Sequence, residues 1–144
     1  MTRVREAGVT TMIVFVRDVM SRGVLTCGLD TPISDIAERM YKAHSTTIVV
    51  VDAIGEVTGI ISRTDLARVF VQGTSGRRAE DIMTANVVTI VPNIPVRAAV
   101  QMMLDRRIHQ VVILHERPAP ARPVGLLSMD DIVRIMAEPG RCET

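Results

Sequence analysis

The stretch GIISRTD, residues 59–65, decides the fold, because it returns later in the chain as GLLSMDD, residues 125–131. Both copies contain a glycine, two apolar residues, a serine and, three residues after the serine, an aspartate. A short apolar run that leads into Ser-x-x-Asp predicts a strand followed directly by a capped helix. Two copies of this junction indicate an internal duplication.

The duplication extends along most of the chain. DVM at residues 18–20 returns as DIM at 81–83, and IVVV at 48–51 returns as VVIL at 111–114, so both matches are displaced by 63 residues. After a longer second hairpin the displacement becomes 66 residues, which aligns the two Ser-x-x-Asp stretches. Ordered matches along a whole unit predict two copies of one structural unit.

Each copy predicts the same order of elements: strand, helix, strand, strand, helix. Apolar residues at helical spacing predict the longer helix, with Thr31 and Pro32 as cap and first-turn residue in the first copy. The two helical stripes are Ile33, Ile36, Ala37, Met40 and Tyr41, and Val96, Ala99, Val100, Met103 and Leu104. β-Branched runs predict the paired strands, and short helices are expected over residues 65–71 and 131–137.

The expected fold is therefore a mixed α+β structure of two pseudo-symmetric β-α-β-β-α repeats. A half of about sixty residues is marginal by itself, so we expect the two sheets to pack face to face. The predicted division is an N-terminal segment over residues 1–15, repeats over 16–71 and 80–138, a polar linker over 72–79, and a tail over 139–144. Because regular patterning begins only near Met12, Met12 is a candidate start besides Met1.

Composition and charge exclude several classes of function. The chain of 144 residues has 17 Lys and Arg against 16 Asp and Glu, which argues against binding to nucleic acid or a membrane surface through a strong overall field. With 47% hydrophobic and 23% charged residues it has the composition of a globular protein. Aromatic residues make up only 2%, too few for a base-stacking platform.

The cysteines and the N-terminal region predict a cytoplasmic location. Cys27 and Cys142 are too few for a disulfide framework or a tetrahedral metal site, and Cys27 is expected to be a buried small apolar residue on the first strand. No signal-peptide pattern is present, and the apolar run 12–16 is too short to span a bilayer. We therefore expect a reduced, soluble, cytoplasmic protein without a metal.

The sequence also favours a protein that is not an enzyme. Lys42 is the only lysine, and no glycine-rich phosphate loop with its lysine, His-Glu-x-x-His motif or nucleophile elbow is present. Asp130 and Asp131 are adjacent at a predicted helix start, so their side chains diverge and are not expected to form a catalytic pair. A hydrolase of unfamiliar type would have to show nucleotide turnover, which we do not expect.

The repeated motifs resemble the CBS domain, which is named after cystathionine β-synthase. Each motif alone is weakly specific, but their order and their duplication are characteristic of the family. The resemblance spans residues 16–137 and rests on the stretches 59–65 and 125–131, the openings 18–20 and 81–83, and the Ile108-His109-Gln110 lead into a strand. It implies a Bateman module, a tandem pair that binds adenine nucleotides such as AMP or ATP, or adenosyl compounds, in clefts between its halves.

The resemblance also implies two sets of ligand-binding residues. The first comprises Thr46, Thr47, Ser62, Thr64 and Asp65, with Met83, Thr84 and Val88 as the adenine wall; the second comprises His109, Gln110, Ser128 and Asp131, with Met20, Ser21 and Leu25 opposite. The aspartate would accept both ribose hydroxyls, and the helix start would hold phosphate. The first set is expected to bind better, because Asp130 would repel phosphate and Gln110 stands where related sites often carry arginine.

The same residues have simpler interpretations. Ser-x-x-Asp is also a capping box, which stabilises a helix start without any ligand. His109 is either a strand-edge residue or, when protonated, a phosphate contact. His44 and His115 are expected on the surface. Arg77-Arg78 and Arg106-Arg107 are either solvated or a source of positive charge for the clefts. The sequence leaves these alternatives open.

Two functions follow from the resemblance. The first is a stand-alone regulatory module that senses an adenosyl small molecule and acts on an unidentified protein in trans, with no chemistry performed on the ligand and no cofactor. The second is a ligand-free scaffold that serves protein interaction by dimerising. Both predict a homodimer, and the apolar helix faces over residues 66–71 and 132–136 are compatible with one.

Overall fold

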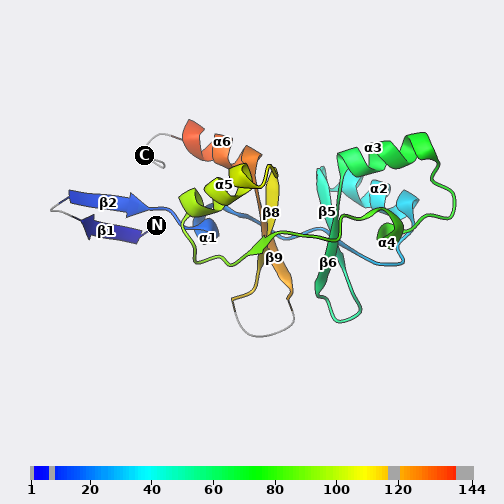
Figure 1. The fold of residues 1–144 in the computed structure, drawn as a ribbon, viewed down its shortest axis with the longest axis horizontal. Helices are drawn as coiled ribbons and strands as arrows, with labels where there is room; N and C mark the ends of the chain where they lie inside the picture. Colours follow the sequence, from blue (N-terminus) through cyan, green and yellow to red (C-terminus); the bar gives the residue numbers. More distant parts are fainter. Residues whose placement is uncertain (1, 7–8, 117–120, 139–144) are drawn as a thin grey trace. The chain divides into compact units, whose positions relative to one another are not determined.

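The fold is that of a computed structural model, which describes residues 2–6, 9–116 and 121–138, with side chains from residue 13 onward. These residues form three sheets: an N-terminal pair of antiparallel strands, a four-stranded sheet in the order β3-β9-β8-β7, and a three-stranded sheet in the order β4-β5-β6 (Figure 1). The mixed α+β class predicted from the sequence is confirmed.

The chain divides into two compact units, and each unit has its own sheet and helices. Unit 1 is built from the described residues of Met1–Arg22, Val88–Arg117 and Val124–Thr144, and unit 2 from those of Gly23–Val87 and Pro118–Pro123. Unit 1 contains β1 (Thr2–Glu6), β2 (Val9–Ile13), α1 (Val16–Val19), β3 (Ser21–Arg22), β7 (Thr89–Ile90), α5 (Val96–Asp105), β8 (Gln110–Leu114), β9 (Pro123–Ser128) and α6 (Met129–Ala137). Unit 2 contains β4 (Thr26–Gly28), α2 (Ile33–Lys42), β5 (Thr47–Val51), β6 (Val57–Ser62), α3 (Arg63–Gln72) and α4 (Ala79–Ile82).

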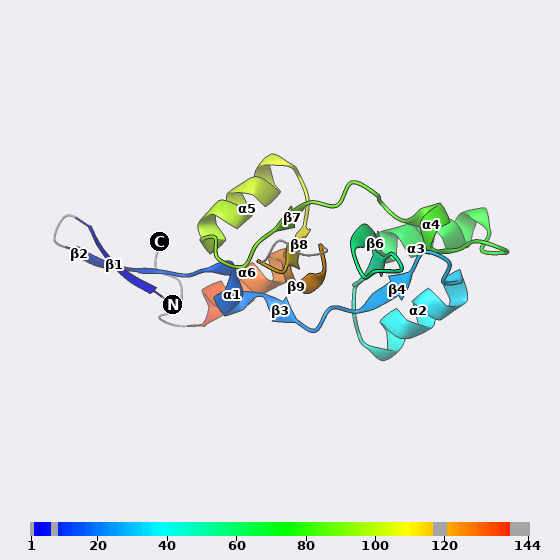
Figure 2. The same cartoon turned by 90° about the horizontal axis from the view of Figure 1, so that it is seen from below.

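Each unit packs its helices on one face of its sheet, as the two views in Figures 1 and 2 show. In unit 2, β5 pairs in parallel with β4 and antiparallel with β6. The core of unit 2 joins buried residues of α2 and α3, such as Ile36 and Val69, to Ile48 and Ile61 of the sheet. The core of unit 1 is built in the same way, with α5 and α6 packed on β8 and β9. Burial of these apolar faces is the main stabilising contribution within each unit.

The opening segments of the two copies are exchanged between the units. Helix α1 belongs to the first copy in sequence, yet its Val16 amide donates to the Ile94 carbonyl in unit 1 (2.9 Å). Helix α4 opens the second copy, and its Ala79 amide donates to the Thr31 carbonyl in unit 2 (2.9 Å). The two bonds are equivalent under the 63-residue displacement. Each unit is therefore completed by a segment of the other repeat.

The predicted order strand, helix, strand, strand, helix is confirmed in both copies, with differences at the ends of elements. Helices α3 and α6 begin at Arg63 and Met129, two residues earlier than expected. The predicted cap of α2 is wrong in detail, because Pro32 occupies the N-cap position and the Thr31 hydroxyl accepts from the Gly28 amide. The N-terminal pair of strands, α1, β3 and α4 were not predicted as separate elements.

The apolar helical stripes are wider than the faces that become buried. Ile33, Ile36 and Met40 are buried in α2, but Tyr41 is 80% exposed. Leu104, the residue of α5 aligned with Tyr41, is also exposed. Cys27 lies in β4 and is buried, as predicted. Among the described helices, none is long and apolar enough to cross a membrane.

Candidate functional site

The start of α3 in unit 2 holds the first predicted aspartate in a capping box. The Asp65 Oδ2 atom accepts from the Ser62 amide (2.8 Å) and from the Ser62 hydroxyl (3.0 Å). In return, the Asp65 amide donates to Ser62 Oγ (3.3 Å). The other carboxylate oxygen, Oδ1, pairs with Arg68 Nη1 (3.2 Å). The Asp65 side chain is 13% exposed, so solvent still reaches the carboxylate.

Unit 2 brings most of the first predicted residue set together. Thr47 pairs with Ser62 across β5 and β6, and the Thr46 carbonyl accepts from the Arg63 amide (3.3 Å). Thr84 exchanges two backbone hydrogen bonds with Ile60, only two residues before Ser62. Thr46, Thr64 and Thr84 are exposed, Met83 is half-buried and Thr47 is buried. Val88, the remaining residue of this set, belongs to unit 1.

The start of α6 in unit 1 repeats the capping box with more hydrogen bonds. The Asp131 Oδ2 atom accepts from the Ser128 amide (2.8 Å) and hydroxyl (3.1 Å). The Oδ1 atom accepts from Ser21 Oγ (3.0 Å) and pairs with Arg134 Nη2 (3.2 Å). The Asp131 side chain is only 7% exposed. This carboxylate is therefore more enclosed than that of Asp65.

Unit 1 also collects most of the second predicted set. The His109 carbonyl accepts from the Met129 amide (2.9 Å), which fixes His109 and Gln110 beside the start of α6. The His109 side chain is exposed, as are those of His44 and His115. Met20 is buried in the core of unit 1, and Leu25 belongs to unit 2. The capping interpretation of both Ser-x-x-Asp motifs is confirmed, and ligand binding by these residues stays a prediction.

The motif glycines have a packing role that the sequence interpretation missed. A Cβ atom at Gly59 would overlap the Met83 side chain, and one at Gly125 would lie 2.7 Å from the Ser21 carbonyl oxygen. Both neighbours belong to the exchanged opening segments. The glycines therefore permit the close approach of those segments to β6 and β9.

Two arginines of the site were also missed as functional partners. Arg68 and Arg134 each stand three residues after a motif aspartate, a spacing that places both side chains on one helix face. Arg134 additionally donates to the Val19 carbonyl of α1 (2.9 Å). The spacing of three residues between aspartate and arginine could have predicted both ion pairs from the sequence.

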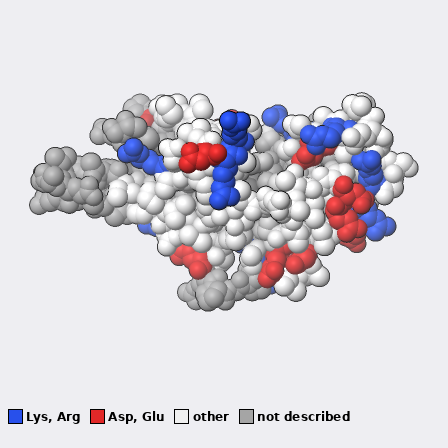
Figure 3. All heavy atoms as spheres, in the orientation of Figure 1, with Lys and Arg blue, Asp and Glu red and all other residues white. Residues whose placement is uncertain are grey.

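Charge and metal-binding groups do not suggest another chemistry in the described part of the chain. On the face shown in Figure 3, acidic and basic side chains are interspersed without a continuous basic area. Among the described residues, no group of three His, Cys, Asp or Glu side chains could hold a metal ion. The candidate sites are therefore the surroundings of the Asp65 and Asp131 carboxylates.

Comparison with known proteins identifies the repeated unit. The family model described as "CBS domain" matches residues 16–72 and again residues 79–138. A CBS domain-containing protein of Arabidopsis thaliana, CBSX3, mitochondrial, is 31% identical over 127 residues, covering 83% of this chain and 59% of that protein. L-Aspartate semialdehyde sulfurtransferase of Methanocaldococcus jannaschii is 28% identical over 123 residues, which cover 85% of this chain and 23% of that enzyme.

Solved structures give the same fold. The CBS domain pair of protein MJ0100, solved in complex with 5′-methylthioadenosine and S-adenosyl-L-methionine, has a TM-score of 0.79 and 28% sequence identity. The match covers 88% of this chain and 98% of that one. The chain spans about three fifths of the length of two curated relatives, 59% and 62%, and about a quarter of the length of two others, 23% and 24%.

Proposed function

The chain belongs to the CBS domain family, and from that premise we propose that it is a regulatory module that binds an adenine nucleotide or another adenosyl compound, such as AMP, ATP or S-adenosylmethionine. The observation that carries this proposal is the aspartate at the third position of α3, presented with hydroxyl groups at the end of β6. Support also comes from the MJ0100 domain pair, which was solved with two adenosyl compounds.

The available acceptor capacity favours Asp65 as the ribose-binding residue. A carboxylate has about four acceptor positions, and three of those on Asp65 are engaged by Ser62 and Arg68. The Arg68 side chain is 59% exposed, so its ion pair is weak and can yield to a ribose diol. Asp131 has all four positions engaged. We therefore assign the primary site to unit 2.

Ligand binding would act by stabilising one arrangement of the chain over another. No bond of the ligand is broken, and the free energy available for signalling is the difference in ligand affinity between the two arrangements. The output would pass to a protein in trans.

A homodimer is part of the proposal. Phe70 and Val71 of α3 are 82% and 85% exposed, and Met136 of α6, which aligns with Phe70, is 73% exposed. Exposed apolar side chains on two helices are typical of an interaction surface. In sedimentation analysis we expect Phe70→Ser to shift the chain toward monomer, and Ile54→Ser, at an exposed hairpin residue, to leave the assembly unchanged.

Calorimetry tests the ligand site. The wild-type chain should bind at least one of AMP, ADP, ATP, NAD, S-adenosylmethionine and methylthioadenosine, and Asp65→Asn should weaken that binding by about tenfold or more, as expected for loss of a charge-assisted contact. Asp81→Asn is the matched control. Asp81 accepts from the Arg78 amide (2.8 Å) at the start of α4, so it caps a helix of the same unit without belonging to the site.

The alternative function is a scaffold that dimerises without a ligand. Thermal melting separates the two proposals, because a ligand at about one hundred times its dissociation constant adds about 2.7 kcal/mol of stability. Unchanged melting curves with all six compounds would favour the scaffold. Equal affinities of the wild type and Asp65→Asn would instead reject only the assignment to Asp65.

A further inference from the structure

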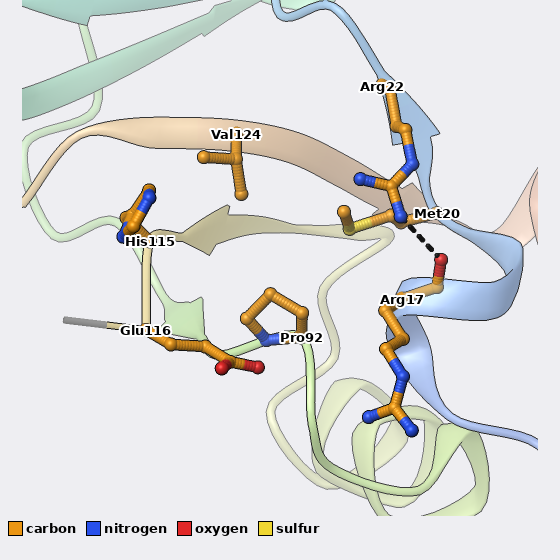
Figure 4. Close-up of a pocket in the computed structure, with 7 residues that line it drawn as sticks. All are labelled: Arg17, Met20, Arg22, Pro92, His115, Glu116 and Val124. Atoms are coloured by element: carbon orange, nitrogen blue, oxygen red, sulfur yellow. Dashed lines mark hydrogen bonds between the residues drawn. The ribbon is translucent and has the colours of Figure 1, made fainter. Parts of the chain in front are cut away.

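A pocket lies within unit 1, at the hairpin end of β8 and β9. Its volume is about 320 Å³, at the lower end of the range of small-molecule sites. Val124, at the start of β9, lines this pocket, whereas Ser128, at the end of β9, caps α6. Met20 and Pro92 complete an apolar surface with Val124 (Figure 4). The pocket is therefore built at the opposite end of β9 from the Asp131 carboxylate.

One side of the pocket carries two guanidinium groups. Figure 4 shows Arg17 and Arg22 on this side and His115 and Glu116 on the other. Arg22 Nη2 donates to the Arg17 carbonyl (3.0 Å), a bond that holds its guanidinium beside the pocket and leaves further N–H donors. The Arg17 guanidinium lies 4.4 Å from the centre of the Phe15 ring.

Arg17 and Arg22 differ from Arg68 and Arg134 in making no close ion pair among the described residues, although Asp18 lies near enough to Arg17 for its pKa to be lowered in part by that charge. Arg68 and Arg134 each pair with an aspartate, but no carboxylate among the described residues forms an ion pair with Arg17 or Arg22. Two guanidinium groups on one side of a pocket, neither in a close ion pair with a described carboxylate, form a recognition element for a carboxylate or phosphate.

The duplicated unit supplies an internal comparison. The residues aligned by the repeat are Arg17 and Glu80, Arg22 and Ala85, and His115 and Asp52. Unit 2 thus has acidic or neutral residues where unit 1 has basic ones. The cationic character of the pocket is consequently a property of unit 1 and not of the repeated fold.

We propose that this pocket binds a small organic anion that carries one carboxylate or phosphate group on an apolar body. The anionic group pairs with Arg17 and Arg22, and the body lies on Met20, Pro92 and Val124. Glu116 on the opposite side disfavours a second anionic group there and favours a hydrogen-bond donor. This site does not depend on the adenosyl site proposed at Asp65.

Amide chemical shifts of the ¹⁵N-labelled chain test the proposal. Phenyl phosphate, benzoate and inorganic phosphate are titrated separately at fixed pH and ionic strength. We expect saturable shifts at residues 17–22 and 115–116, with phenyl phosphate binding more tightly than inorganic phosphate because its ring contacts the apolar surface. The ratio of phenyl phosphate to benzoate affinity shows which headgroup the arginines prefer.

The test variants replace residues of unit 1 by the residues aligned with them in unit 2, and a third replacement of the same kind outside the pocket serves as the control. Arg17→Glu and Arg22→Ala install the aligned residues of unit 2, and each should weaken phenyl phosphate binding by about tenfold or more. Arg97→Ser likewise copies the aligned Ser34, at an exposed position of α5 outside the pocket, and should leave the affinity unchanged. The proposal is overturned if no probe saturates, if Arg22→Ala binds as well as Arg97→Ser, or if the shifts centre on Ser128 and Asp131.

Discussion

The two Ser-x-x-Asp motifs form the same capping box, but their aspartates accept different numbers of hydrogen bonds. Asp65 in unit 2 accepts from Ser62 and pairs with Arg68. Asp131 in unit 1 makes the equivalent bonds and accepts one more, from the Ser21 hydroxyl, 110 residues away in sequence. Thr84 is the residue aligned with Ser21, and its hydroxyl makes no such bond to Asp65 among the described residues.

This difference shows how a duplicated element can divide its roles. A carboxylate whose acceptor positions are all engaged contributes to stability, and one with a free position and a weak ion pair can exchange a partner for a ligand. We therefore expect Asp131 to be mainly structural and Asp65 to be mainly a binding residue. Each of the following experiments would sharpen or remove this contrast.

The largest effect is expected from removing the two carboxylates. Asp131→Ala removes a carboxylate that is only 7% exposed and leaves the half-buried Ser128 amide without its acceptor, which should lower the free energy of unfolding by about 2–3 kcal/mol. Asp65→Ala removes a more exposed cap and should cost about 1–2 kcal/mol. Urea denaturation of both variants measures the two costs. Equal losses would contradict the assignment of different roles.

Removing the extra donor should make the two aspartates more alike. Ser21→Ala frees one acceptor position of Asp131 and should cost about 0.5–1.5 kcal/mol, the usual contribution of one hydrogen bond. Thr84→Ala at the aligned position should be nearly neutral. On addition of S-adenosylmethionine, we expect amide shifts at Ser128 and Asp131 to be larger in Ser21→Ala than in the wild type. Unaltered shifts would mean that Ser21 does not limit this site.

Much of the local structure could be predicted from sequence, because it depends on neighbouring residues. Ser-x-x-Asp predicted both capping boxes, and the β-branched runs predicted β5 and β8, since these patterns act within a few residues. The resemblance of the motifs to the CBS domain was also sufficient to identify the family, which the two matches of the family model confirm.

Contacts between distant segments could not be predicted in the same way. Helix α1 has the same apolar pattern as α4, so nothing local indicates which unit each helix completes. The bond from Ser21 to Asp131 follows from that exchange, because β3 places Ser21 opposite Leu126 of β9. The pocket beside Arg17 and Arg22 joins α1 and β3 to the ends of β8 and β9, and no sequence pattern relates them.

Cys27 gives unit 2 a buried titratable group that unit 1 does not have at the aligned position, which is occupied by Ile90. The pH dependence of stability can therefore report on unit 2. Burial raises the pKa of the Cys27 thiol above its ordinary value, although Arg39 and Thr31 act in the opposite direction. Above the ordinary thiol pKa the unfolded chain ionises and the folded chain does not, so stability falls as the pH rises through that value. The free energy of unfolding should therefore decline between pH 8 and 10 more steeply in the wild type than in Cys27→Ala. Parallel declines would show that Cys27 does not titrate differently on unfolding.

Removing the two arginines should affect stability less than removing the aspartates with which they pair. Arg68→Ala removes an exposed ion pair and should cost no more than about 0.5 kcal/mol. Arg134→Ala also removes the hydrogen bond to the Val19 carbonyl and should cost about 1 kcal/mol. Both values come from denaturation curves.

The ligand affinity of Arg68→Ala then decides what the exposed ion pair does at the binding site. Without Arg68, the Asp65 Oδ1 atom has no described donor, so a ribose diol no longer has to displace a partner. We expect calorimetry to show adenosyl binding equal to or tighter than that of the wild type. Weaker binding would instead identify Arg68 as a direct contact to the ligand, and the contrast with Asp131 would then rest on charge around the site and not on free acceptor capacity.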